Sequence, residues 1–134
     1  MHDASAQTFL RDARREALST LWDFNVVWHE QSHDVAAIEN GSILGAARIS
    51  IAASVAHVGA LIVLPDSRRR GVGRRLLVAA EEIANYYNCH KISVEVPHRS
   101  SAQEFFERCG YKEEALLSQH TWKRDVAVLR KFLL

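Results

Sequence analysis

Cysteine, proline and long hydrophobic runs are all scarce in this chain of 134 residues. The two cysteines, Cys89 and Cys109, form no CxxC pair, and the histidines lack metal-ligand spacing, so we expect neither a disulfide framework nor a metal site. No stretch approaches about 18 uninterrupted apolar residues, and the amino end lacks a basic segment followed by an apolar one. We therefore expect no membrane span and no secretion signal, and a reducing cytoplasm fits the cysteine usage.

An excess of charge of one sign is also missing. The formal net charge is +1, with 25% charged and 48% hydrophobic residues, which is the composition of an ordinary globular protein. A chain of this length is expected to form a single domain over residues 1–134. Because the charges nearly cancel, the chain as a whole has no general attraction to nucleic acid.

Positive charge is concentrated in one stretch, "DSRRRGVGRRLL", which spans residues 66–77. The stretch holds five arginines: Arg68, Arg69, Arg70, Arg74 and Arg75. No aromatic residues alternate with them as stacking platforms, so we expect no nucleic-acid partner. A small partner fits this local patch better.

The amino-terminal part of the chain has one clear helical pattern. After a capping residue at Asp3 or Ser5, apolar residues recur every four positions, which predicts an amphipathic helix; they are Phe9, Ala13, Ala17 and Leu21. Residues 21–34 combine a strand-like apolar centre with aromatic residues of a helical kind, and the pattern leaves them unassigned.

The pair Asn40-Gly41 separates two apolar runs and predicts the turn of an antiparallel hairpin. In the second run, simple alternation places four residues on one face: Ile43, Ala47, Ile49 and Ile51. Residues 58–64 are apolar at nearly every position and are stopped by Pro65, as expected of a central strand that is buried on both faces.

A strand, the arginine-rich loop and a helix follow one another directly. The helix is predicted by an apolar stripe at helical spacing, formed by Val72, Leu76, Ala79, Ala80, Ile83 and Tyr87. The next segment, "KISVEV", alternates as a strand does, and a right-handed crossover would place it parallel to the central strand.

The last third predicts one more helix and two strands. Ser101 and Glu104 stand at capping-box spacing and Gly110 is a suitable stop, so we expect a short helix between them. The tail has a polar break near residues 119–124, between two strands. The whole chain is therefore predicted to be α/β (mixed α+β), with a sheet of about six strands flanked by three or four helices.

The arginine-rich loop has the features of a phosphate-binding turn. A helix amino terminus presents unpaired N–H groups and partial positive charge, and Gly71 and Gly73 let a phosphate approach closely. A Walker loop would need lysine and Ser or Thr where Arg74 and Arg75 stand. The dinucleotide fingerprint would need a third glycine at Leu76. Both of these common loops are excluded.

The remaining pattern, Arg68-x-x-Gly71-x-Gly73 after "LIVLP", resembles the acetyl-CoA loop of the GNAT superfamily of N-acetyltransferases. The stretch "SVEVPHRSSAQEFFERCGYKEE" is similar to that family's second motif, in the same order and spacing. The resemblance implies a mostly antiparallel mixed sheet that splays apart for acetyl-CoA. It implies that the backbone of Leu61, Ile62 and Val63 pairs with the pantetheine arm. The phosphates would lie against Arg68, Arg69, Arg70, Gly71, Val72, Gly73 and Arg74.

The resemblance further implies direct acetyl transfer to an amine, without a metal. The acceptor is a small-molecule amine or a peptide or protein amine. Backbone N–H groups at a bulge near Leu61 would stabilise the oxyanion. His57, expected on the same side of its strand as Gly59, Leu61 and Val63, is the candidate base for the amine proton, against the alternative of a structural histidine.

Glu95 and His120 are weaker candidates for the same role and are expected to be surface residues. Cys109 belongs to an apolar stripe and is expected to be core rather than a nucleophile. Phe106 stands where many members carry a tyrosine that protonates the departing sulfur, so Tyr111 or water would have to replace it. This departure keeps open a non-catalytic module that binds CoA or acyl-CoA. A homodimer formed by extending a sheet through "DVAVLRKFLL" also remains possible.

Overall fold

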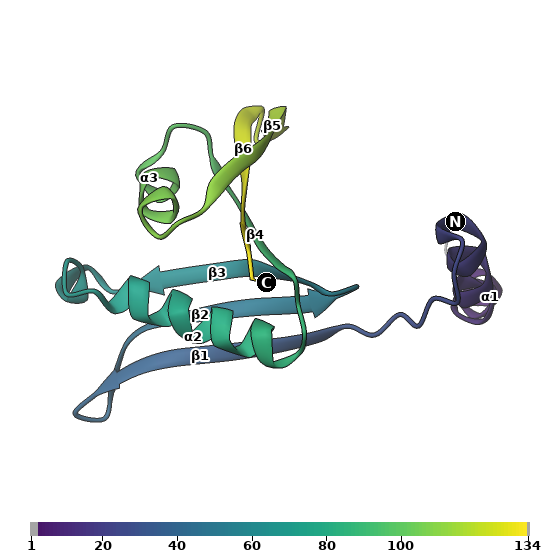
Figure 1. The fold of residues 1–134 in the computed structure, drawn as a ribbon, viewed down its shortest axis with the longest axis horizontal. Helices are drawn as coiled ribbons and strands as arrows, with labels where there is room; N and C mark the ends of the chain where they lie inside the picture. The colour runs from purple at the N-terminus through teal and green to yellow at the C-terminus, as the bar shows by residue number, and fades with distance from the viewer. Residues whose placement is uncertain (1–2, 134) are drawn as a thin grey trace.

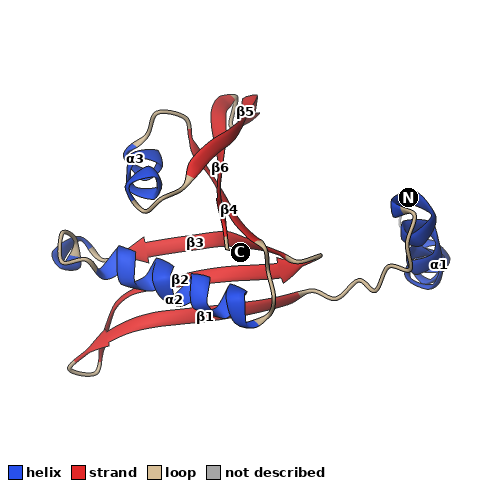
Figure 2. Cartoon of the chain, in the orientation of Figure 1, coloured by secondary structure: helices blue, strands red, loops and turns tan. Residues whose placement is uncertain are grey.

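The computed structural model describes residues 3–133 and confirms a mixed α/β architecture (Figures 1 and 2). The helices are α1 (Ala4–Trp22), α2 (Val72–Tyr86) and α3 (Ser101–Arg108), with a short 3₁₀ turn at Pro65–Ser67. The strands are β1 (Gln31–Glu39), β2 (Ser42–Ala52), β3 (Val55–Val63), β4 (Lys91–Pro97), β5 (Lys112–Thr121) and β6 (Arg124–Phe132). Among these helices, none is both long and apolar enough to span a membrane.

The six strands form one sheet in the order β1-β2-β3-β4-β6-β5. Only β3 and β4 run parallel, joined by the crossover through α2, so the sheet is mostly antiparallel as predicted. The β1–β2 turn uses Asn40 and Gly41 with φ of 51° and 79°, the left-handed pair of a tight hairpin. Strand β6 is paired on both sides, so the expectation that its segment extends a sheet across two chains is wrong.

The core lies on one face of the sheet, which we call the covered face. α2 lies along β1, β2 and β3, and α3 packs against β4 and β6 (Figure 1). Ile92, Leu129 and Leu77 are almost completely buried there. The buried residues of α2 recur at helical spacing, and those of β4 alternate; they are Val72, Leu76, Leu77, Ala80, Ala84, Ile92, Val94 and Val96. The stripe predicted for α2 is only partly right, because Tyr87 is exposed, Ala79 and Ile83 are half-buried, and Leu77 and Ala84 are buried in addition.

The opposite face of β1, β2 and β3 carries no helix within residues 3–133, and we call it the bare face. Ile38, Ile43 and Ile62 lie on it with exposed fractions of 65%, 57% and 64%. Two sequence expectations are therefore wrong. The central strand is not buried on both faces, and a register shift opposite Ile38 turns Ile43 away from Ala47, Ile49 and Ile51.

The amino-terminal helix stands apart from the sheet (Figure 1). Asp3 caps it by accepting the Ser5 N–H at 2.9 Å, and it ends at Asp23, which has a left-handed φ of 60°. None of its residues is buried. Residues 23–30, which the sequence left unassigned, form an irregular linker to β1. Helix α1 and this linker together are called the arm below.

The cap of α3 differs from the predicted one by one residue. Ser100, not Ser101, is the N-cap, and its hydroxyl accepts the Gln103 N–H at 3.1 Å. The Gln103 side chain in turn accepts the Arg99 N–H at 2.7 Å. The arrangement differs from a capping box, because Gln103 accepts from Arg99, the residue before the cap, whereas the Ser100 N–H donates to the Pro97 carbonyl at 3.3 Å.

Candidate functional site

Strands β3 and β4 separate halfway along the sheet. They pair from Val55 with Lys91 to Val58 with Val94 and no further. β4 continues to pair with β6 up to Pro97, whereas residues 59–63 of β3 have no partner on the β4 side. A bulge opposite Arg48 and Ile49 accompanies the separation. Unpaired backbone groups along a strand can accept an extended chain as an additional strand.

The amino end of α2 opens at the mouth of this gap. Gly71 is its N-cap with φ 76°, a conformation that favours glycine, and no side chain caps the helix. The first helical hydrogen bond runs from the Arg75 N–H to the Gly71 carbonyl at 3.1 Å. The N–H groups of residues 72–74 therefore have no intrahelical acceptor and are available to an anion.

Two adjoining hollows form one groove from the loop into the gap. The hollow at the loop has a volume of about 350 Å³ and the hollow in the gap about 500 Å³. They share Val63, Arg68, Gly73 and Phe105. Nine of the ten residues expected to bind the cofactor line this groove: Leu61, Ile62, Val63, Arg68, Arg69, Gly71, Val72, Gly73 and Arg74. Arg70 does not, because its guanidinium binds Glu39 at 2.6 Å.

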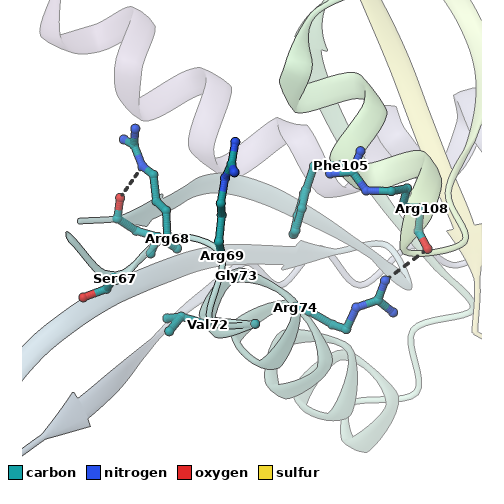
Figure 3. A pocket seen from close by; sticks show the side chains of 10 residues that line it. Ser67, Arg68, Arg69, Val72, Gly73, Arg74, Phe105 and Arg108 are labelled. Atoms are coloured by element: carbon teal, nitrogen blue, oxygen red, sulfur yellow. Dashed lines mark hydrogen bonds between the residues drawn. The ribbon is translucent and has the colours of Figure 1, made fainter. Parts of the chain in front are cut away.

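The groove is lined by cations from two elements (Figure 3). Arg68 and Arg69 project from the loop to the same side, and Arg68 Nε donates to the Val63 carbonyl at 3.2 Å. Arg74 donates to the Arg108 carbonyl at 3.3 Å, which ties α2 to the end of α3. Arg108 itself lines the groove. Four guanidinium groups around one hollow suit a ligand with several negative charges.

From α3, sequence reasoning named only Phe106 as a residue near the cofactor, and Phe106 does line the groove. It missed four other residues of α3 that line it: Ser101, Ala102, Phe105 and Arg108. A Cβ atom on Gly73 would lie only 3.3 Å from Phe105 Cζ, so the absence of a side chain at Gly73 leaves room for the Phe105 ring. The helical spacing of the second motif already placed Phe105 on the packed side of α3, but it gave no sign that this side meets the glycine loop.

His57 lies on the bare face, and the expectation that it shares a side with Leu61 and Val63 is wrong. It is paired with Ser50, whereas Leu61 is paired with Ala47 on the covered face. The extra residue of the bulge between Val58 and Leu61 reverses the alternation. The half-buried imidazole places Nδ1 3.3 Å from Ser93 Oγ on β4, next to the point where the two strands separate.

Within residues 3–133, no hydrogen bond joins His57 to either of the other candidate bases, Glu95 and His120. Glu95 is exposed on β4, and His120 is exposed and paired with the neighbouring Thr121 hydroxyl at 3.0 Å. Cys109 packs against the core and both cysteines are free thiols. The described residues contain no group of three or more side chains that could hold a metal ion.

Neither aromatic residue considered for the leaving sulfur offers an available hydroxyl. Phe106 is buried and packs edge-to-face against Phe105 and Tyr111, with ring centroids 5.2 and 5.3 Å apart. The Tyr111 hydroxyl donates to Glu81 at 2.7 Å. Burial, followed by this hydrogen bond, raises the pKa of Tyr111 far above its usual range. Tyr111 therefore holds its proton toward α2 rather than toward the groove.

Comparisons with solved structures identify the same fold. An acetyltransferase from Bacillus cereus is 18% identical with a TM-score of 0.79, covering 98% of this chain and 94% of that one. The ribosomal-protein-S18-alanine N-acetyltransferase of Escherichia coli is 20% identical with a TM-score of 0.68, covering 76% and 69%. A candidate streptothricin acetyltransferase from Bacillus anthracis, solved with acetyl coenzyme A, is 20% identical with a TM-score of 0.71, covering 75% and 62%.

At these identities the structures establish the fold alone. No curated protein sequence matches the chain. A family model does: the acetyltransferase (GNAT) family matches residues 3–111, which include β3, the loop, α2, β4 and α3. The match therefore spans most of the chain and every element that lines the groove. The chain belongs to the GNAT family of acetyltransferases.

Proposed function

We propose that this protein transfers an acetyl group from acetyl-CoA to a primary amine. The observation that carries the proposal is the gap between β3 and β4, which continues into the groove at the uncapped end of α2. An extended polar arm ending in phosphates matches that shape and charge. Bound acetyl-CoA would supply the acetyl group as a thioester, whose C–S bond breaks as the amine nitrogen attacks the carbonyl carbon.

The chain's residues have separate parts in this proposal. The N–H groups at the start of α2 and the guanidinium groups of Arg68, Arg69, Arg74 and Arg108 would hold the phosphates. The free edge of β3 would hold the arm. The bulge before Leu61 would direct backbone N–H groups at the carbonyl oxygen, where negative charge develops.

His57 would accept a proton on the side of the sheet opposite α2. Its Nδ1 faces Ser93, and its Nε2 makes no hydrogen bond within residues 3–133. An alkylammonium is a poor nucleophile near neutral pH, so the acceptor must lose a proton before it attacks. We therefore expect the acceptor amine to approach from the bare face and to pass its proton to Nε2, directly or through water.

A second function, binding of CoA or acyl-CoA without transfer, is favoured by one observation. Phe106 has no proton to donate and the Tyr111 hydroxyl is engaged with Glu81, so neither side chain protonates the leaving sulfur. Transfer remains feasible without such an acid, because a thiol with a pKa of about 8.5 leaves as the thiolate with modest help.

Our proposal for the acceptor covers small-molecule amines and peptide or protein amines alike. Some structural neighbours are named for a ribosomal-protein alanine and others for antibiotics such as nourseothricin, so the fold itself does not choose between these classes. We also propose a reducing compartment such as the cytoplasm, because both cysteines are unpaired thiols.

One experiment separates the two functions. The protein is incubated with acetyl-CoA and a broad panel of amines and peptides, and released CoA thiol is measured, while calorimetry measures CoA binding. Transfer predicts amine-dependent thiol release above the rate of uncatalysed hydrolysis. Binding of CoA without turnover on any amine would support the binding module, and failure of CoA to bind would contradict both functions.

A further inference from the structure

The arm has an apolar stripe whose large side chains are mostly exposed. Phe9, Leu10 and Leu21 lie within about a third of the circumference of α1, given 100° per residue, together with Ala13 and Ala17. Their side chains are far from buried, with exposed fractions of 68% for Phe9 and 74% for Leu21. A soluble helix of this kind is normally stabilised by burying its apolar stripe, so α1 lacks the partner that its sequence calls for.

The bare face also exposes apolar side chains that nothing covers within residues 3–133. Strand pairing aligns Ala36, Ala46 and Ile62 in one row across β1, β2 and β3, and Ile38 with Ile43 in the next row. Three of these side chains are isoleucines that are more than half exposed. Alanines flanked by larger apolar side chains form a surface on which a helix can lie closely.

We propose that two copies of the chain form a dimer in which the apolar stripe of α1 in one copy packs on the bare face of the other. In the resulting two-fold dimer, α1 of each chain lies on the bare face of the other. The exchange is reciprocal, so both exposed surfaces of both chains are buried at once, as closed symmetry requires. The inference stands on packing alone and holds whether or not the protein transfers acetyl groups.

The structure of the arm directs α1 away from its own sheet. The linker folds back along the helix: the Val26 N–H donates to Ser19 Oγ at 2.9 Å, and the Arg14 guanidinium lies 5.0 Å from the centre of the Trp28 ring. These contacts fix the helix and linker as one unit beyond the β2–β3 turn (Figure 1). A unit that is already ordered loses little further entropy when it binds a second copy.

The area of such an interface is adequate. A helix of 19 residues is about 28 Å long and about 10 Å wide, so two exchanged helices bury about 1,100 Å² in total. Apolar side chains at the end of α1 and in the linker add to this, because Trp22, Phe24 and Val27 are exposed beside a hollow of about 540 Å³ at the β2–β3 turn. The sum reaches the range of about 1,200 to 2,000 Å² that is typical of specific interfaces.

The exchange also has a consequence for the site. His57 lies on the bare face in the row formed by Ser32, Ser50 and Ser93. Helix α1 of the second copy would cover this face next to His57 and form one wall of the space from which an acceptor approaches. Each complete site would then contain residues of both chains.

Light scattering after size exclusion tests the proposal on the full chain. We expect a mass of about twice the 15.1 kDa of one chain. Phe9→Asp places a charge in the apolar stripe, and Ala46→Asp places one in the bare face; each should raise the dimer dissociation constant at least about 30-fold. Thr8→Asp is the matched control, since it adds the same charge in the same turn outside the stripe. Circular dichroism verifies that all variants are folded.

Mixing the two defective variants identifies the surfaces that meet. A mixed dimer retains one intact pair, in which the normal helix of the Ala46→Asp chain lies on the normal face of the Phe9→Asp chain. We expect it to bind at least about 10-fold more tightly than either variant alone, as half of the interface is restored. A wild-type chain that is monomeric at about 100 μM would overturn the proposal. So would a mixture that gains no affinity, because the dimer would then use a different surface, such as the edge of β1.

Discussion

The covered and bare faces of this sheet both carry isoleucine and alanine, but they differ in what packs on them. On the covered face, α2 and α3 bury the apolar side chains of the strands in two clusters. On the bare face, isoleucines stay exposed and the Asp34–Arg48 ion pair crosses between strands at 2.7 Å. The hydrophobic effect therefore stabilises the chain chiefly from one side. The other side carries His57 and is open to partners.

The boundary between the two faces depends on two bulges. Alternation within a strand assigns a residue to a face only while the register is regular, and one extra residue reverses it. The irregularity at Gly59 and Ala60 puts His57 and Leu61 on different faces of the sheet. The irregularity next to Ile38 likewise puts Ile43 and Ala47 on different faces. A candidate base is thereby separated from the side on which the α2 amino terminus lies.

The largest expected effect compares two isoleucines, one on each face. Ile92→Ala leaves a cavity in the core, where the side chain is completely buried, and should lower the free energy of unfolding by about 2–5 kcal/mol. Ile38→Ala, at a position that is exposed in the single chain, should change it by no more than about 0.5 kcal/mol at protein concentrations below dimer dissociation. Urea unfolding of the two variants at such concentrations measures both values. Equal losses there would mean that the bare face is covered within the monomer.

The next effect concerns catalysis on the bare face. His57→Gln keeps a polar group near Ser93 and removes the group that takes up a proton, so turnover should fall roughly 10²-fold while CoA affinity is unchanged.

A histidine on the covered face provides the control. His33 packs against Tyr87, with ring centroids 4.9 Å apart, and His33→Gln should leave turnover near normal. Turnover and melting temperature are measured together on both variants. If His57→Gln lowers only the melting temperature, the histidine is structural and the proton leaves by another route.

Local pattern predicted most of the fold, and the resemblance to the GNAT family predicted most residues of the groove. The order of strands and helices, the Asn40-Gly41 turn and the position of the glycine loop all follow from short-range signals that bulges do not disturb. The face of His57, the contact of Phe105 with Gly73 and the detached arm could not be predicted. Each depends on register or on packing between distant segments, which the periodicity of one segment does not encode.

A smaller effect is expected at the groove itself. Gly73→Val brings a β-branched side chain against Phe105, whose ring stands 3.3 Å from the position of the new Cβ, so the ring must move and the added methyl groups take up space in the groove that both residues line. We expect CoA to bind at least tenfold more weakly, which corresponds to about 1.4 kcal/mol. The matched control is Asn85→Val, which adds the same side chain at an exposed position near the other end of α2, away from the groove. Calorimetry that finds equal CoA affinity in both variants would show that the groove does not bind CoA.

On the covered face, Tyr111 should make the free energy of unfolding depend on pH in the alkaline range. Burial and the Glu81 hydrogen bond raise its pKa, so the folded chain keeps the phenol proton above pH 10, where the unfolded chain loses it. Stability from this group is full below about pH 10 and falls as the pH rises, by up to about 1.4 kcal/mol per pH unit. Unfolding curves at pH 9 to 11 should show this loss in the wild type and not in Tyr111→Phe. Parallel losses in both proteins would assign the effect to other groups.

The smallest effect belongs to the Asp34–Arg48 pair on the bare face, where acid pH is the informative condition. The Arg48 hydrogen bond lowers the pKa of Asp34, so any stability from the pair is present above the ordinary value of about 3.9 and is lost as pH falls through the lowered value. Both side chains are about 60% exposed, with fractions of 60% and 65%, so water and salt weaken the pair. Asp34→Asn should therefore leave the free energy of unfolding nearly unchanged at pH 7 and indistinguishable from wild type at pH 3. A clear loss of stability at pH 7 that resists added salt would mean that the pair is shielded from water, as it would be beneath the α1 helix of a second copy. Measuring this loss at protein concentrations above and below dimer dissociation would decide whether that helix shields the pair.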